Sequence, residues 1–163
     1  MGAAENRFDT EYRELTGNDK PYPWQRRLYE RFVSGGSYDV LDIPTGLGKT
    51  SVIPIWLLAY LHAEPDRRPP MRLVYVVNRR TIVDQATHVA EQRQQAIADQ
   101  ATDVAKRLHE KLGKDKLSVS TLRGALADNG NWRLAPHRPA IIIGTVDMIG
   151  SRLLFNAYRA GRW

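Results

Sequence analysis

The stretch over residues 43–51, I-P-T-G-L-G-K-T-S, constrains the fold more than any other part of the chain. Two glycines, a lysine and a hydroxyl side chain stand between a predicted buried strand, residues 38–43, and an apolar run from residue 51 that predicts a helix. Gly46 and Gly48 leave backbone N–H groups free to face phosphate oxygens, and the following helix directs its positive dipole end to the same place. The pattern predicts a phosphate-binding loop; the alternative is a glycine-rich turn with a surface lysine.

The residue types in this loop predict a division of roles. Lys49 is expected to reach the β- and γ-phosphates of a nucleoside triphosphate, and Thr50 is expected to ligate Mg²⁺. We predict both as catalytic residues, with Thr50 also the metal ligand, and ATP and Mg²⁺ as the cofactors. The predicted nucleotide contacts of the loop are Thr45, Gly46, Leu47, Gly48, Lys49, Thr50 and Ser51.

Hydrophobic patterning along the rest of the chain predicts an α/β fold with a mainly parallel sheet. After a polar lead-in, the expected elements are a helix over residues 26–33, strands over 38–43, 72–77, 117–122 and 140–143, and a last helix over 146–158. The apolar strand over 72–77 is expected to be covered on both faces. Residues 80–112 are helical in composition and predict two helices or one with a weak join. We expect residues 1–37 to form an N-terminal segment and residues 38–163 a partial ATP-binding domain.

The amino-acid composition limits the possible classes of protein but does not identify a binding partner. The chain has 163 residues, suits one domain, and carries a net charge of +6, with arginine supplying 18 of its 24 basic residues. Such a surface permits nucleic-acid binding, although coding bias enriches arginine as well. The absence of cysteine excludes disulfides and thiolate zinc sites. The N-terminus lacks a secretory signal and the longest apolar stretch, residues 52–61, is about half a membrane span, so we predict a cytoplasmic protein without a membrane partner.

The loop departs from the commonest phosphate-binding motif because Ile43 stands where the first glycine is usual. In this form it resembles motif I of superfamily 2 helicases. Gln25, in a Pro-Trp-Gln setting ahead of the loop, resembles the Q motif of the same superfamily, and Phe8 lies 17 residues before it. The resemblance implies that Gln25 reads the adenine edge and that Phe8 stacks on the ring. The alternative is that Phe8 and Trp24 are core residues.

The segments that follow the predicted strands predict a nucleic-acid interface, because ligands bind at the carboxyl ends of parallel strands. Residues 77–85, V-N-R-R-T-I-V-D-Q, resemble motif Ia, and residues 144–147, G-T-V-D, resemble motif Ib. The predicted contacts are Arg79, Arg80, Thr81, Arg123, Gly124, Thr145 and Asp147. For the arginines of residues 79–80, the alternative is a helix start with solvated side chains. Asp147 lies beyond its strand and lacks a following glutamate, so a Walker B acid is not predicted there.

Taken together, these motifs resemble the CRISPR-associated nuclease-helicase of type I systems, with type I-U (I-G) the nearest subtype. The resemblance covers the first RecA-like domain of that family and implies a three-layer RecA-like P-loop fold. It implies ATP-driven unwinding and degradation of target DNA by a longer parent. It also implies single-stranded DNA and a guide-RNA effector complex as partners, with the second RecA-like domain and the nuclease outside this chain.

An NTPase of this superfamily also needs an Asp-Glu box and arginine fingers from a second domain. The sequence contains no Asp-Glu pair, so we expect a fragment truncated before that box, with weak nucleotide affinity and negligible turnover. Two other functions stay open. One is a docking module for the CRISPR effector complex with an unused phosphate loop. The other is a P-loop kinase or transferase, for which the sequence shows no lid and no acceptor site.

Overall fold

The structure is a computed structural model that describes residues 6–44, 46–77, 87–112, 116–122, 136–146 and 149–150. The chain divides into two compact units, Met1–Met71 and Arg72–Trp163, here called the N-terminal and C-terminal units. Each unit is described by itself. The predicted division at residue 37 stays a prediction, whereas the first structural unit extends to Met71 because the helix after the phosphate loop packs with the helices before it.

The N-terminal unit begins with helix α1, Arg7–Thr16, which the sequence patterning did not predict. Its start is capped by Asn6, whose side chain accepts a hydrogen bond from the Phe8 amide, and its end by Gly17 in the left-handed conformation at φ 75°. Arg7 and Glu11 pair one turn apart at 2.8 Å on its exposed side. The predicted polar lead-in is therefore a capped amphipathic helix.

Helix α2, Pro23–Val33, confirms the predicted helix and begins three residues earlier than expected. Pro23 stands at the first helical position, where its fixed φ is favourable and its missing N–H is not needed. The Gln25 side chain turns back and accepts a hydrogen bond from the Tyr22 amide at 2.8 Å. This bond satisfies one of the donors that a helix N-terminus leaves unpaired.

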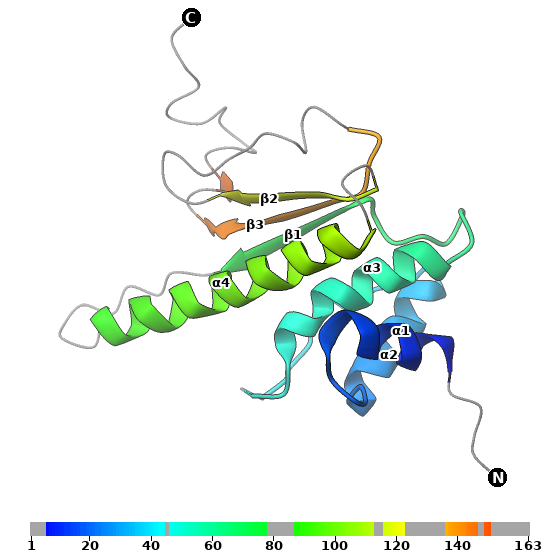
Figure 1. The fold of residues 1–163 in the computed structure, drawn as a ribbon, viewed down its shortest axis with the longest axis horizontal. Coiled ribbons are helices and arrows are strands. Elements are labelled where there is room, and N and C mark those ends of the chain that lie inside the picture. Colours follow the sequence, from blue (N-terminus) through cyan, green and yellow to red (C-terminus); the bar gives the residue numbers. More distant parts are fainter. Residues whose placement is uncertain are drawn as a thin grey trace, which may run out of the picture. The chain divides into compact units, whose positions relative to one another are not determined.

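Helix α3, Val52–His62, follows the phosphate loop through one short 3₁₀ turn, η1, Lys49–Ser51, and confirms the predicted helix. Helices α1, α2 and α3 enclose the core of this unit (Figure 1). The buried members of the cluster are Phe8, Tyr12, Leu28, Ile55 and Leu58. Each helix therefore contributes to one core, which fixes where the loop between α2 and α3 starts and ends.

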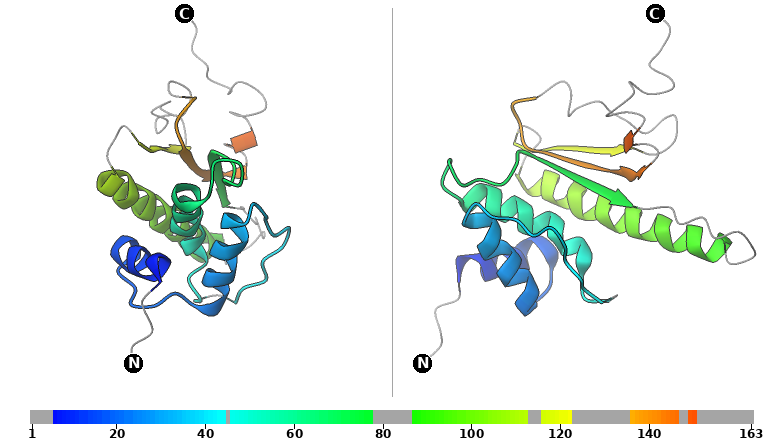
Figure 2. Two further views of the ribbon diagram at one scale, coloured as in Figure 1. Left: turned by 90° about the vertical axis from the view of Figure 1, so that its right-hand side faces the viewer. Right: turned by 180° about the vertical axis from the view of Figure 1, so that it is seen from behind.

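The described residues of the C-terminal unit form a parallel three-stranded sheet with one long helix on it. Its elements are β1 (Arg72–Val77), α4 (Thr87–Leu112), β2 (Ser118–Leu122) and β3 (Ala140–Thr145). The strand order is β1-β3-β2, and both outer strands run parallel to β3. Helix α4 lies along one face of the sheet in every view (Figures 1 and 2). The predicted α/β class and parallel sheet are confirmed.

Two strand predictions are corrected. Residues 38–43 form no strand, and Val40 and Leu41 are 80% and 40% exposed. A strand needs a ladder partner, the described sheet consists of the other three strands, and Asp39 and Asp42 break the apolar run. The prediction that β1 is covered on both faces is also wrong. As an outer strand of the described sheet it leaves Val74 and Val76 exposed, and β3 is the strand whose apolar residues are buried throughout.

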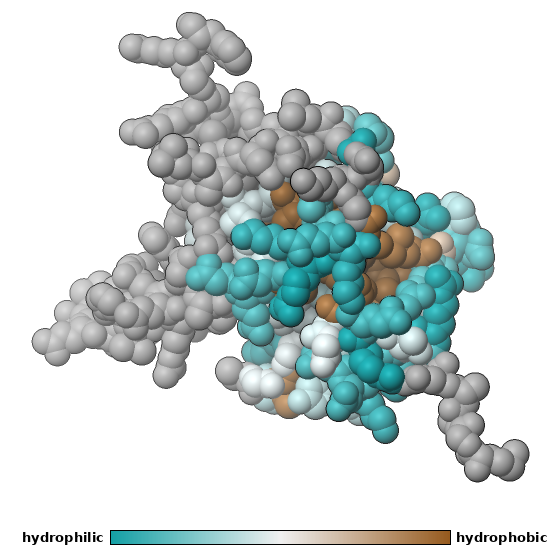
Figure 3. Space-filling model, in the orientation of Figure 1, coloured by the Kyte–Doolittle hydropathy of each residue, from teal (hydrophilic) through white to brown (hydrophobic). Residues whose placement is uncertain are grey.

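Hydrophilic residues make up most of the described surface on the face in Figure 3, with smaller hydrophobic patches between them. Among the described residues, the exposed large hydrophobic ones are Tyr22, Tyr38, Val40, Leu41, Leu61, Met71, Val74, Val76 and Val146. They come from several separate segments, so no single amphipathic helix accounts for them.

Helix α1 is attached to α3 and α2 by a polar chain through His62. The Nε2 atom of this ring lies 2.6 Å from a carboxylate oxygen of Glu11, and its Nδ1 atom lies 2.8 Å from the Tyr29 hydroxyl. Because a carboxylate can only accept, His62 donates from Nε2, and in the neutral ring Tyr29 donates to Nδ1. Burial by itself would raise the pKa of Glu11, but the hydrogen bonds from Arg7 and His62, with their charges, lower it overall.

We expect the free energy of unfolding to depend on the Glu11 charge in acid. A carboxyl whose pKa is lowered by folding stabilises the folded state above its ordinary value of 4.5, and this contribution is lost as the pH falls through the lower folded value. The Glu11→Gln variant should be less stable than wild type at neutral pH and should lose less stability below 4.5. Urea unfolding at stepped pH measures this. Glu64→Gln, which changes an exposed carboxylate of the same unit, is the control and should follow wild type.

Candidate functional site

The phosphate loop has the backbone that its glycines predict. Gly46 and Gly48 have φ angles of 90° and 69°, in the left-handed region where a side chain is strained. Both are exposed, and a Cβ placed on Gly46 would meet no atom within 4 Å. Thr45 lies outside the described residues. The open side of the loop therefore leaves space for an anion to approach the backbone closely.

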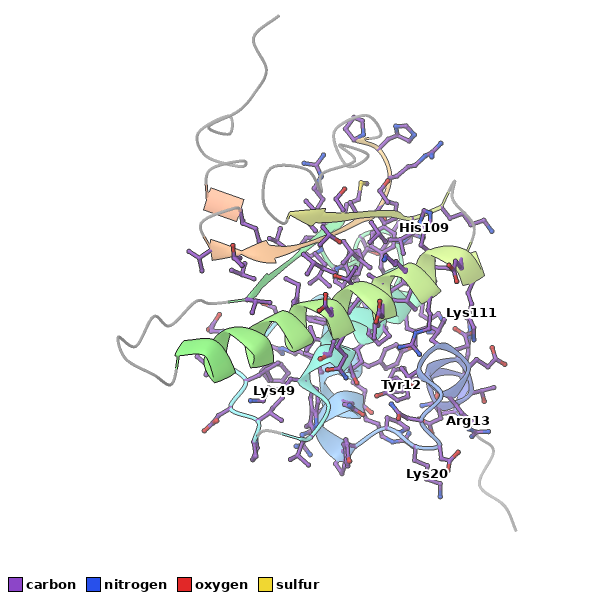
Figure 4. The ribbon with its side chains drawn as sticks, turned by 60° about the vertical axis from the view of Figure 1, so that its left-hand side comes forward. Tyr12, Arg13, Lys20, Lys49, His109 and Lys111 are labelled. Atoms are coloured by element: carbon purple, nitrogen blue, oxygen red, sulfur yellow. The ribbon has the colours of Figure 1, made fainter. Side chains whose placement is uncertain are left out.

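The residues after Gly48 place the charged and hydroxyl groups. Lys49 is exposed at the start of η1 (Figure 4), whereas Thr50 and Ser51 are each 9% exposed. The Ser51 amide is hydrogen-bonded to the Gly48 carbonyl at 2.9 Å, which closes the turn. A polyphosphate binds to hydrogen-bond donors and positive charge. A lysine ammonium at the surface and the backbone N–H groups of a glycine turn that runs into a helix supply both. These residues fit the predicted cofactor chemistry.

A buried hydrogen-bond bridge, formed by Tyr12, Gln25 and Ser51, lies beneath the loop. The Tyr12 hydroxyl lies 3.0 Å from Gln25 Oε1 and 2.9 Å from Ser51 Oγ. Tyr12 and Gln25 are each 1% exposed, and Tyr12 points from α1 into the unit (Figure 4). This bridge joins α1, α2 and the loop, three segments that are separate in sequence.

The backbone of Gly48 packs directly against the residues of this bridge. A Cβ at Gly48 would stand 3.2 Å from Gln25 Nε2 and 3.4 Å from Ser51 Oγ. The φ angle therefore favours glycine there, and a Cβ would also require Gln25 or Ser51 to move by a few tenths of an ångström. The amide group of Gln25 faces the loop backbone, so the predicted Q-motif glutamine and the predicted phosphate loop are brought together by the fold.

Trp24 supplies a second attachment for the loop. Its ring Nε1 donates a hydrogen bond to the Leu47 carbonyl at 3.1 Å. Trp24 is half-buried and packs against the helical core, which agrees with the alternative that it is a core residue. Its indole N–H nevertheless fixes the backbone between Gly46 and Gly48. No pattern in the sequence predicted this contact.

Phe8, the predicted adenine-stacking residue, lies in the core instead. It is 1% exposed and its ring stacks on Tyr29 with centroids 4.1 Å apart. An aromatic ring with its face already covered offers no platform to a base, so the alternative of a core residue describes this structure. The reason is the amphipathic character of α1, in which Phe8, Tyr12 and Leu15 recur on one side.

The hydrogen bonds of Gln25 limit how this side chain could contact an adenine base. Its Oε1 atom is within hydrogen-bond distance of both the Tyr12 hydroxyl and the Tyr22 amide, which occupy the two lone pairs of an amide oxygen. Contact with a base through Gln25 would therefore use its amide N–H groups or require one of these bonds to break. Base reading by Gln25 stays a prediction.

The predicted nucleic-acid contacts follow strands that end at one edge. In the parallel register Val77 is opposite Thr145, and Leu122 is opposite Gly144. Strands β1, β2 and β3 therefore all end at the same edge of the sheet. Thr145 is the last residue of β3. The other predicted contacts, Arg79, Arg80, Thr81, Arg123, Gly124 and Asp147, lie outside the described residues.

Tyr12 is the residue of this site that the sequence analysis missed. A signal was present, because Asn6 and Gly17 bracket a helix whose apolar residues recur every three or four positions. That signal predicts a helix with Tyr12 on its buried face. The hydroxyl contact with Ser51, 39 residues away, depends on how the helices pack and has no sequence signature.

The fold is of the α/β class with a parallel sheet, and its glycine loop runs into a helix. Residues 18–153 match the family model described as "Type III restriction enzyme, res subunit", and the chain belongs to this family. The family is helicase-like and acts with ATP, typically with Mg²⁺. Curated proteins and solved structures give no match. In the part of the chain that the structure describes, no helix has the length and apolar character needed to cross a membrane.

We predict that Gly48→Ala destabilises the fold more than Gly17→Ala does. Both glycines have similar left-handed φ angles, 69° and 75°, so alanine costs about 1–2 kcal/mol of backbone strain at either position. At Gly17 a Cβ meets nothing within 4 Å, whereas at Gly48 it crowds Gln25 and Ser51. Chemical denaturation of the two variants measures the difference. Equal losses of stability would mean that Gly48 is not tightly seated on the bridge.

Proposed function

We propose that the chain binds Mg-ATP at the loop over residues 46–51 and forms the ATP-binding part of a superfamily 2 DNA helicase or translocase. One observation carries the proposal. The left-handed glycine loop, which presents Lys49, is packed on Gln25 from the helix before it. Family membership supports the ATP-dependent helicase class. The DNA substrate is our proposal.

The proposed division of work follows from where the side chains lie. Lys49, exposed beside the loop, binds phosphate oxygens as a point charge, and the loop backbone near Gly48 approaches them without a Cβ in the way. The hydroxyl of Thr50, at the first helical turn, would hold the metal ion. A Mg²⁺ ion held there would supply positive charge that offsets the negative charge of the bound phosphates. Since the sequence has no Asp-Glu pair, we propose binding with negligible turnover by this chain alone.

We expect Lys49→Ala to weaken Mg-ATP binding by about 10- to 150-fold, because charge-assisted hydrogen bonds contribute about 1.5–3 kcal/mol. Calorimetric titration measures the dissociation constants. Lys20→Ala removes one exposed positive charge elsewhere in the same unit and is the matched control (Figure 4). It should bind as wild type does. Equal weakening by both variants would point to nonspecific attraction of the nucleotide, and no binding by wild type would contradict the proposed function.

Single-stranded DNA is the proposed second ligand. The three strands reach one edge at Val77, Leu122 and Thr145, and ligands of open parallel sheets bind at this end. The basic sequence, with a net charge of +6, supports an anionic partner at this edge. The residues proposed to contact the DNA are Arg79, Arg80, Thr81, Arg123, Gly124, Thr145 and Asp147.

Paired replacement of Arg79 and Arg80 by alanine should weaken DNA binding and reduce its salt dependence. For a single strand, removal of one arginine–phosphate pair should lower the slope of log affinity against log salt by about 0.7. Fluorescence anisotropy with a labelled oligonucleotide at several salt concentrations gives both quantities. Arg67→Ala, which removes an exposed arginine from the N-terminal unit, is the control. If the control lowers the slope equally, DNA binding is not specific to the strand ends.

The finer assignment, to the helicase of type I CRISPR systems, is a proposal supported by the motif resemblance over residues 78–85 and 144–147. In that role the longer parent would unwind and degrade DNA marked by a guide-RNA effector complex. Capture of the effector complex by the chain, dependent on bound DNA and Mg-ATP, would support this role. Capture without nucleotide that survives Lys49→Ala would favour the docking module instead. No capture would leave the helicase class without the CRISPR role.

A further inference from the structure

Tyr12, the residue of α1 in the hydrogen-bond bridge, contacts the loop but belongs to neither of the predicted nucleotide-binding motifs. Tyr12 reaches Ser51 in the first helical turn and Gln25 in α2 with one hydroxyl group, at 2.9 Å and 3.0 Å. The side chain is 1% exposed, so these groups satisfy the hydroxyl inside the protein. A buried hydroxyl that lacked partners would destabilise the folded state, so this geometry is a strong local constraint.

The chemistry of the three groups fixes the direction of the hydrogen bonds. Gln25 Oε1 can only accept, so Tyr12 donates its single proton to it, and Ser51 therefore donates to the Tyr12 oxygen. The Tyr22 amide donates to the same Gln25 oxygen at 2.8 Å. Each hydroxyl in this chain polarises the next, which strengthens the bridge as a unit. The orientation of Ser51 thus depends on Tyr12.

We propose that Tyr12 is a positioning residue for the phosphate loop and that nucleotide binding requires α1 to be docked. The inference rests on the proposed function. Gly48 is seated against Gln25 and Ser51, so the groups that Tyr12 holds are the ones that support the loop backbone. When α1 is displaced, Gln25 and Ser51 lose their common partner and the loop loses its support. Docking of α1 then controls the nucleotide site without touching the nucleotide.

Helix α1 has other contacts with α2 and α3 that do not involve the loop, so its docking can be tested separately from its effect on the loop. Asp9 is paired with Arg26 at 2.5 Å, Glu11 with His62, and Phe8 stacks on Tyr29. These contacts hold α1 on α2 and α3, whereas Tyr12 adds the contact with the loop. Tyr29 offers a matched comparison, because its half-buried hydroxyl lies 2.8 Å from His62 rather than from the loop.

The test compares Tyr12→Phe with Tyr29→Phe, since each removes one hydroxyl from the same three-helix core. Both variants should unfold at somewhat lower denaturant than wild type. Tyr12→Phe should weaken Mg-ATP binding by about 3- to 10-fold, the size of one net hydrogen bond. Tyr29→Phe should leave Mg-ATP binding unchanged, because the Asp9–Arg26 and Glu11–His62 pairs still hold α1 in place. In the ligand-free proteins, amide hydrogen exchange over residues 48–51 should be faster in Tyr12→Phe alone.

The outcomes separate this inference from the proposed function. Equal effects of the two variants on Mg-ATP binding and on loop exchange would overturn the role of Tyr12, with ATP binding left standing. If wild type fails to bind Mg-ATP, or if Lys49→Ala binds equally well, the proposed function is wrong. In that case the exchange measurement still decides whether Tyr12 orders the loop. Coupling of Tyr12→Phe and Ser51→Ala in a double-mutant cycle would support a direct contact, and additive effects would contradict it.

Discussion

The candidate site depends on one buried hydrogen-bond bridge. Tyr12, Gln25 and Ser51 come from three separate segments, and each supplies a partner that another would lack in a buried environment. Polar groups without water are stabilised only when such partners are in place. The loop, α1 and α2 must therefore reach their positions together, and the glycine at residue 48 lets the loop come close enough to rest on the bridge.

Gln25 shows how one side chain can satisfy two requirements. As the third helical residue of α2 it accepts a hydrogen bond from the Tyr22 amide, which is ordinary helix capping. Its other contacts are with the Tyr12 hydroxyl and near Gly48 of the glycine loop. A glutamine at this position therefore stabilises the helix start and also fixes the loop. The Pro-Trp-Gln pattern that resembles a Q motif is thus also a pattern that starts a helix.

Hydrophobic patterns predicted the structure correctly where the conformation of a segment depends mainly on its own residues. The apolar runs at 72–77 and 140–143 became β1 and β3, and the glycines of the loop adopted the left-handed angles that favour glycine. The patterns failed where strand formation depends on pairing with another strand. Residues 38–43 have strand-like composition but no ladder partner among the described residues, and β1 lies at the edge of the described sheet with Val74 and Val76 exposed. Strand formation depends on neighbours that a single segment does not specify.

The sequence by itself predicted the class of the candidate site, because Gly46, Gly48, Lys49 and Thr50 in that order favour phosphate binding. It also determined the α/β plan, since the alternation of apolar strands with a helical stretch is local information. The tertiary structure alone decided which residues meet. It placed Phe8 in the core on Tyr29 and brought Tyr12 to Ser51 across 39 positions. Such contacts arise from the packing of α1, α2 and α3, and packing over long sequence distances leaves no periodic signal in the chain.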